Sequence, residues 1–268
     1  MTSQEACQLL ENTTYFVNIY LKEGEAPPEL ISEGSAVAIN STGDLLTAAH
    51  VVTTRLPVRE EDVRDPNAVI LAMRKGGRLA RYYPVLCGLT VRVGDYLTTP
   101  ITIDLAVLRP VAPQRGTPFL PLSIESPKLG DRVLMAGYPD DVKLPFSFDR
   151  ILNPANPQIE AQRFNLDIAR RLLMVRSGMI GNRSGVIINE EHSGHIFYID
   201  NALHPGASGG PVVNYDGEIV GILTERAITT VPYEDTPSLR VPSGAAVAMT
   251  PRIILHQLRT MGVVNLTT

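Results

Sequence analysis

The sequence predicts an all-β fold. Its 268 residues contain many short runs of apolar and β-branched residues, and turn residues separate these runs at close intervals. Many short strands at such spacing are typical of a barrel or a sandwich. The turn sequences STGD at 41–44 and YDGE at 215–218 favour hairpin loops. We expect strands at 15–21, 34–40, 44–48, 68–73, 104–108, 132–136, 173–180, 196–199, 211–213, 218–223 and 245–248.

A proline-rich segment divides the chain. Four prolines lie between residues 109 and 122. Proline cannot donate to a central sheet ladder, so prolines at this density favour an extended connector. We therefore expect two units, a first at 1–115 and a second at 116–268.

Two helices are predicted among the strands. Thr250 is a suitable N-cap, Pro251 fits the first helical position, and Gly262 would end a C-terminal helix. A second helix is expected after Asn156, where apolar residues recur at helical spacing up to residue 172. Its apolar face would dock onto a barrel, and a regulatory lid is the alternative.

Composition and charge exclude several classes of protein. The chain is 44% hydrophobic and 19% charged, with no apolar run near the roughly 18 residues that a membrane helix needs. Its net charge of −4 gives no basic footprint for nucleic acid. The start of the sequence lacks a secretory pattern, and Cys7 and Cys87 are the only cysteines. We expect a cytoplasmic protein, with a trimmed secreted chain as the alternative.

The strongest local signal is the loop 205–211, with the sequence PGASGGP. Glycines around Ser208 let the backbone bend sharply, which exposes the hydroxyl and turns nearby amides towards the same space. This arrangement suits a nucleophile beside an oxyanion hole. Taken alone, the loop could equally be a tight turn or a phosphate-binding nest.

Two further residues carry chemistry. His50 lies at the end of an apolar run, LLTAAHVV, where a histidine is more often structural than catalytic. Asp104 heads another apolar run, DLAVL. Because an unpaired buried carboxylate is costly, Asp104 needs a donor, and a histidine Nδ1–H would serve.

Together these three segments resemble trypsin-like serine proteases, since His50, Asp104 and Ser208 follow one another in the order of the chymotrypsin type. The chain is most similar to the bacterial HtrA/Deg branch, and the resemblance runs from Gly34 to the C-terminal helix. It implies two six-stranded antiparallel β-barrels with the triad between them, a C-terminal helix and an inserted helix. The HtrA-like motifs are LGDRVLMAGYP at 129–139, SGMI at 177–180, IDN at 199–201 and GEIVGI at 217–222.

The resemblance implies a serine endopeptidase that acts on protein or peptide substrates through an acyl-enzyme. His50 would be the base, Asp104 its partner and Ser208 the nucleophile, with the amides of Gly206 and Ser208 as the oxyanion hole. No metal or organic cofactor is expected. The alternatives are a protease-like module that binds peptides without cutting them and a serine esterase.

The chain departs from the family pattern in several places. Ala202 stands six positions before the nucleophile, where trypsin has an aspartate, so we expect cleavage after small or medium apolar residues. Thr224 is placed to bind the substrate backbone. Ala207 replaces the aspartate that receives a freed N-terminus, so no activation by N-terminal cleavage is expected. We also expect no PDZ module, and residues 140–173 form an insertion with no assigned role.

Overall fold

The computed structural model confirms the predicted fold class. Its strands form two closed antiparallel barrels, each of six strands. The expected inserted helix lies outside the described residues. The described residues are 1–21, 29–53, 68–91, 101–140, 172–187, 193–201, 205–233 and 236–263.

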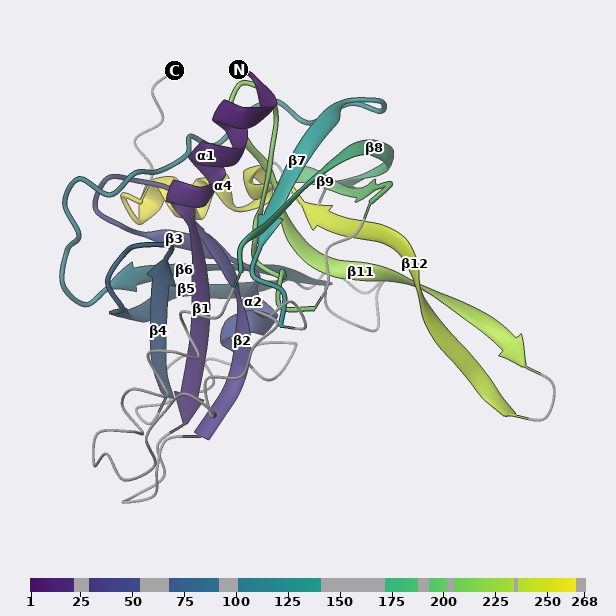
Figure 1. The fold of residues 1–268 in the computed structure, drawn as a ribbon, viewed down its shortest axis with the longest axis horizontal. Helices are drawn as coiled ribbons and strands as arrows, with labels where there is room; N and C mark the ends of the chain where they lie inside the picture. The colour runs from purple at the N-terminus through teal and green to yellow at the C-terminus, as the bar shows by residue number, and fades with distance from the viewer. Residues whose placement is uncertain are drawn as a thin grey trace, which may run out of the picture.

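The first barrel is built from the N-terminal half of the chain (Figure 1). Its strand order is β1-β2-β3-β6-β5-β4, and pairing between β1 and β4 closes it. Its strands are β1 (Thr14–Leu21), β2 (Glu29–Ala38), β3 (Leu45–Thr47), β4 (Ala68–Arg74), β5 (Ala80–Val91) and β6 (Ile101–Pro110).

The second barrel follows in the order β10-β11-β12-β9-β8-β7, and pairing between β7 and β10 closes it. Figure 1 shows the ends of β11 and β12 projecting from the body as a long two-stranded hairpin. The strands of the second barrel are β7 (Arg132–Gly137), β8 (Met174–Ile187), β9 (Ser193–Ile199), β10 (Pro211–Val213), β11 (Ile219–Tyr233) and β12 (Thr236–Met249).

A continuous apolar core joins the two barrels. Leu46 and Leu105 of the first barrel pack in one buried cluster with Leu134 and Ile222 of the second. Because burying a leucine or isoleucine side chain stabilises a fold by about 1.5–3 kcal/mol, this shared core holds the barrels as one body. Each barrel also has an interior cluster of its own.

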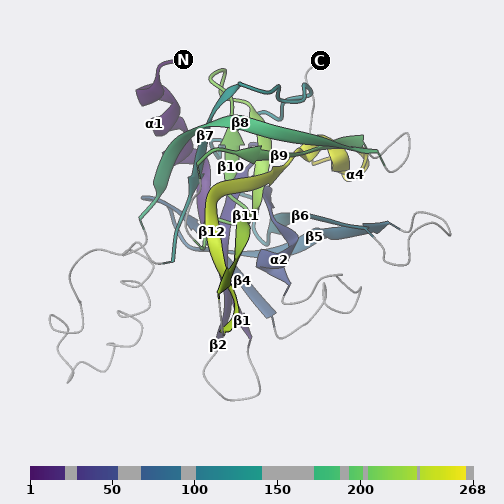
Figure 2. The same cartoon turned by 90° about the vertical axis from the view of Figure 1, so that its right-hand side faces the viewer.

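Figure 2 shows α1 (Ser3–Thr13) and α4 (Leu255–Thr260) on opposite sides of the molecule, with α2 (Ala49–Val52) near its centre. Helix α1 was not predicted, although Thr2 and Glu5 form a capping box at its start. At the C-terminal end a 3₁₀ turn, η4 (Pro251–Ile254), leads into α4. None of the helices in the described ranges is long and apolar enough to cross a membrane.

Thr250 is the N-cap residue of η4 and Pro251 follows it, as expected, but the cap lacks its side-chain hydrogen bond. The Thr250 hydroxyl instead accepts a hydrogen bond from the His195 amide at 2.9 Å, which ties the end of β12 to β9. The sheet therefore uses the hydroxyl that the helix would otherwise have taken.

Candidate active site

His50 and Asp104 come together through the strand pairing of the first barrel. His50 lies in α2 (Ala49–Val52), a single helical turn shortly after β3. Strand β3 pairs with β6, so that Thr47 lies opposite Ala106. This register brings His50 at the exit of β3 close to Asp104 on β6, and α2 packs against β2, β5 and β6 (Figure 2).

Asp104 makes two hydrogen bonds with the same residue. Its Oδ2 lies 2.7 Å from His50 Nδ1, and its Oδ1 accepts the His50 backbone amide at 2.8 Å. Asp104 is only 8% exposed, so its charge needs these donors. When Nδ1–H donates its hydrogen bond to this carboxylate, Nε2 of the neutral imidazole is free to accept a proton.

The surroundings of His50 favour its protonated form. Burial acts to lower the pKa of His50, but the hydrogen bond and charge of Asp104 raise it, and the charge of Glu225 raises it further. The net result is a pKa above the ordinary value for histidine. An imidazolium that forms during a reaction would therefore be stabilised at this position.

The loop that carries Ser208 depends on its glycines. Gly209 has a φ of 84°, and a Cβ there would lie 2.1 Å from both the Ser35 carbonyl oxygen and Thr47 Oγ1. The Gly209 amide donates to the Leu223 carbonyl at 2.7 Å, which fixes the loop against β11. No larger residue fits this approach, so the loop has one tightly held conformation.

The peptide group between Pro205 and Gly206 has a defined orientation. The Pro205 carbonyl accepts the Asp140 amide at 2.8 Å. In a planar trans peptide the N–H points opposite to the carbonyl, so the Gly206 N–H is directed away from Asp140. Gly206 has a φ of 85°, and a Cβ there would lie 2.7 Å from Asp140 N and from the Tyr138 carbonyl oxygen.

Ser35 of β2 is a central contact that the sequence analysis missed. The Ser35 amide donates to the Ser208 carbonyl at 2.8 Å, and its hydroxyl donates to the Gly206 carbonyl at 2.9 Å. The same hydroxyl accepts the Tyr138 amide at 2.8 Å. Ser35 is fully buried, so one residue of the first barrel holds the Ser208 loop of the second. A serine next to the apolar run AVAI at 36–39 was the only signal in the sequence.

Ser208 approaches the first barrel closely but does not contact His50 through a hydrogen bond. A Cβ on Gly34 would lie 3.1 Å from the Ser208 carbonyl oxygen and 2.6 Å from Val51 next to His50. Within the described ranges, no hydrogen bond joins the side chains of His50 and Ser208. Such catalytic bonds are often long without substrate and tighten when it binds.

The residues expected to contact substrate are only partly described. Thr224 lies on β11 and is buried, and its hydroxyl donates to the Val247 carbonyl of β12 at 3.5 Å. Ala202 lies outside the described residues. Glu225 follows Thr224 and is exposed. The roles of Ala202 and Thr224 in substrate binding stay predictions.

Cysteines and metal ligands do not gather at this site. Cys7, which is half-buried, and Cys87, which is buried, are not joined in a disulfide. In the part of the chain that the structure describes, no group of three or more His, Cys, Asp or Glu residues could hold a metal ion. The groups that the structure brings together here are an imidazole and a carboxylate, beside a loop that carries a hydroxyl and backbone amides.

Comparison with known families agrees with this geometry. The family model of the trypsin-like peptidase domain matches residues 34–222, a span that contains His50, Asp104 and Ser208. No curated protein matches the sequence. The family match covers more than half of the chain and both barrels contribute to it. The chain belongs to the trypsin-like peptidase family.

Proposed function

We propose that the chain is a serine endopeptidase in which His50, Asp104 and Ser208 form the catalytic triad. The observation that carries this proposal is the pair of hydrogen bonds between Asp104 and His50, beside a glycine-framed loop that holds Ser208. Asp104 fixes the tautomer in which Nε2 of His50 accepts a proton. The family match and the two barrels support a protease.

Peptide cleavage would proceed in two steps. His50 Nε2 takes the proton of Ser208 Oγ, the oxygen attacks the substrate carbonyl carbon, and the imidazolium then gives the proton to the leaving amine. A water molecule, activated by the same histidine, releases the acyl group from Ser208. The raised pKa of His50 favours the imidazolium that both steps require.

The amides of Gly206 and Ser208 would stabilise the oxyanion. The Gly206 N–H points away from the Asp140 segment, because the Pro205 carbonyl is held on that side. A donor of this kind is typically worth about 3–4 kcal/mol of barrier. The position of the Gly206 amide depends on glycine at this residue, because the positive φ and the close approach of Asp140 and Tyr138 exclude a side chain there.

A substrate would bind as an added strand on β11. Strand β10 pairs with β11 only as far as Ile222, and Leu223 is hydrogen-bonded to the nucleophile loop. From Thr224 onwards, the described structure pairs β11 with β12 on one side only. An unpaired strand edge beside a nucleophile can take up an extended peptide by main-chain hydrogen bonds.

We further propose that the protease is of the HtrA type and prefers small or medium apolar residues before the cleaved bond. The HtrA-like motifs support the first point. The second follows from Ala202, which offers no carboxylate to a basic side chain.

A peptide-binding module without activity is the second candidate. The observation that favours it is the lack of a His50–Ser208 hydrogen bond among the described residues. Such a protein would hold an extended peptide on β11 and leave it intact. A serine esterase would use the same acyl chemistry on esters, so activity on proteins must be measured directly.

The test is cleavage of a casein-like protein by the wild type, Ser208→Ala, Asp104→Asn and a control, Asp44→Asn. Asp44 is a buried carboxylate of the same barrel that pairs with Arg109, so its variant controls for loss of a buried charge. Ser208→Ala should lower cleavage by several orders of magnitude, and Asp104→Asn by about 10⁴-fold, as expected for a triad of this type. Asp44→Asn should cleave normally while it is folded.

Near wild-type cleavage by folded Ser208→Ala would contradict the proposal. Casein left intact by every one of these proteins, the wild type included, would favour the binding module.

A further inference from the structure

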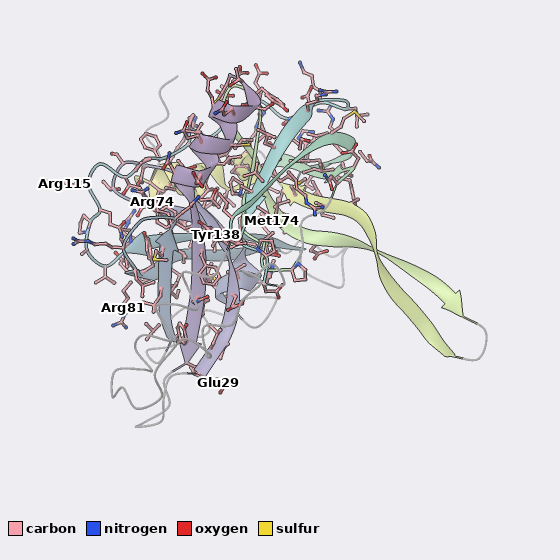
Figure 3. The ribbon with its side chains drawn as sticks, viewed as in Figure 1. Glu29, Arg74, Arg81, Arg115, Tyr138 and Met174 are labelled. Atoms are coloured by element: carbon pink, nitrogen blue, oxygen red, sulfur yellow. The ribbon has the colours of Figure 1, made fainter. Side chains whose placement is uncertain are left out.

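A cavity of about 780 Å³ opens on the first barrel, away from the catalytic residues. It lies between the β4–β5 hairpin and the connector 111–118 that follows β6. Four arginines line it, Arg74, Arg78, Arg81 and Arg115. Figure 3 shows three of them, Arg74, Arg81 and Arg115, on the flank opposite the β11/β12 hairpin. None of the triad residues contributes to this cavity.

Among the described residues, no side chain neutralises the positive charge of this cavity. The described lining contains no carboxylate. The nearby acids have other partners, because Glu11 pairs with Lys75 and Asp44 pairs with Arg109. Across the described ranges, the four cavity arginines form no salt bridge. The chain as a whole carries a net charge of −4, so this concentration of cations is local.

The cavity wall is held in place before any ligand binds. The Val111 amide donates to the Arg81 carbonyl at 2.9 Å, and the Gln114 amide donates to the Thr42 carbonyl at 3.1 Å. Thr117 closes a turn onto Gln114 through both its amide and its hydroxyl. A wall fixed in this way loses little conformational freedom on binding, which favours affinity.

The interior side of the cavity carries a buried phenol. Tyr15 of β1 lines the cavity together with Arg74 and Thr117. Burial raises the pKa of Tyr15, and the charge of the nearby Arg74 acts to lower it. Tyr15 therefore adds a phenol to the lining beside a cation of the hairpin.

We propose that this cavity binds a compact small molecule that carries at least two phosphate groups. Guanidinium groups match the geometry of phosphate oxygens and bind them through paired, charge-assisted hydrogen bonds. A phosphate monoester carries a charge of about −1.5 to −2 at neutral pH, so two such groups neutralise four arginines. The cavity volume falls in the range of about 300–1,000 Å³ typical of small-molecule sites.

The shape and lining favour a small molecule over an acidic peptide. The arginines line a cavity, whereas an extended peptide is better matched by a flat row of cations or a strand edge. Leu79, Val111 and Pro113 add apolar surface beside the arginines, where an organic group could lie. Inorganic polyphosphate and a phosphorylated organic compound share the required chemistry, and the experiment below separates them.

The experiment is calorimetric titration of the full chain with inorganic triphosphate, a nucleoside triphosphate and orthophosphate, without divalent cations. Triphosphate should bind at least tenfold more tightly than orthophosphate, and its affinity should fall as salt increases. Tighter binding of the nucleoside triphosphate than of inorganic triphosphate would assign the ligand to the organic class, and equal binding to the inorganic one. No measurable triphosphate binding would overturn the proposal.

Substitutions of the cavity arginines test whether triphosphate binds at this cavity. Arg81→Gln and Arg115→Gln should each weaken triphosphate binding about tenfold or more, because each removes charge-assisted hydrogen bonds. Arg132→Gln is the matched control, since Arg132 is an exposed arginine on β7 of the other barrel, and it should bind as the wild type does. Unchanged melting temperatures without ligand would show that the variants are folded. Equal affinity in all three variants, or tighter binding of an oligoglutamate peptide than of triphosphate, would overturn the proposal.

Discussion

Replacing Ser35 with alanine removes one hydroxyl that connects the two barrels under the nucleophile loop. In the native protein this hydroxyl donates to the Gly206 carbonyl and accepts the Tyr138 amide. The alanine fits the same space, because it is smaller than serine. The amide and carbonyl of residue 35 keep their bonds to Ser208 and Thr47. The variant therefore tests the hydroxyl alone.

The expected effects follow from the two lost hydrogen bonds. The Tyr138 amide would be left buried without its acceptor, which typically costs about 1–3 kcal/mol, so we expect the free energy of unfolding to fall by about 2 kcal/mol. For activity, loss of an entire oxyanion donor costs about 10²–10³-fold in kcat. The bond from Asp140 to Pro205 still restrains the Gly206 amide. Because one of two restraints remains, we expect a fall of about tenfold in kcat with little change in KM.

The assay is steady-state hydrolysis of a peptide substrate together with urea unfolding. Thr250→Val is the control, because Thr250 is also buried and its hydroxyl also accepts a backbone amide, that of His195, outside the active site. It should lose comparable stability and keep its kcat. An unchanged kcat in Ser35→Ala, or an equal fall of kcat in Thr250→Val, would refute the reasoning.

Three further predictions follow from the site. Gly206→Ala should abolish hydrolysis, because its Cβ would meet Asp140 and Tyr138, whereas Gly76→Ala, also at positive φ but in open space, should keep its activity. The neutral form of His50 is the base, so kcat/KM should rise with pH through a midpoint above the ordinary value of about 6.5, and Glu225→Gln should lower that midpoint. An unshifted midpoint in Glu225→Gln would contradict this account. In a mixed peptide library most cuts should follow Val, Ala, Leu or Thr, and a majority after Arg or Lys would contradict the specificity.

The fold class could be predicted because strand signals are local. Alternating apolar runs and turn residues depend on neighbours in the chain, and most strands were placed from them. Strand β5 was missed, and its pairing with β6 is interrupted by bulges near Pro84 and Cys87. Helix α1 was also missed, although its capping box at Thr2 and Glu5 can be read in the sequence. The boundary placed at residue 115 stays a prediction.

Some residues of the candidate site could also be predicted from short motifs, whereas others could not. His50, Asp104 and Ser208 each lie in a short motif, so the sequence alone could nominate them. Ser35 could not be found, because its partners Tyr138 and Gly206 lie more than 100 positions away in the sequence. The cavity arginines were missed for the same reason, since the hairpin and the connector meet only in the folded barrel.

Labelling with a fluorophosphonate probe, with the adduct located by mass spectrometry, tests the central claim most directly. The probe reacts with a serine only when a neighbouring base and an oxyanion site activate its hydroxyl. We predict one adduct per chain on Ser208, lost in Ser208→Ala and strongly slowed in His50→Ala. A folded wild-type protein without an adduct, or an adduct that persists in Ser208→Ala, would contradict the account.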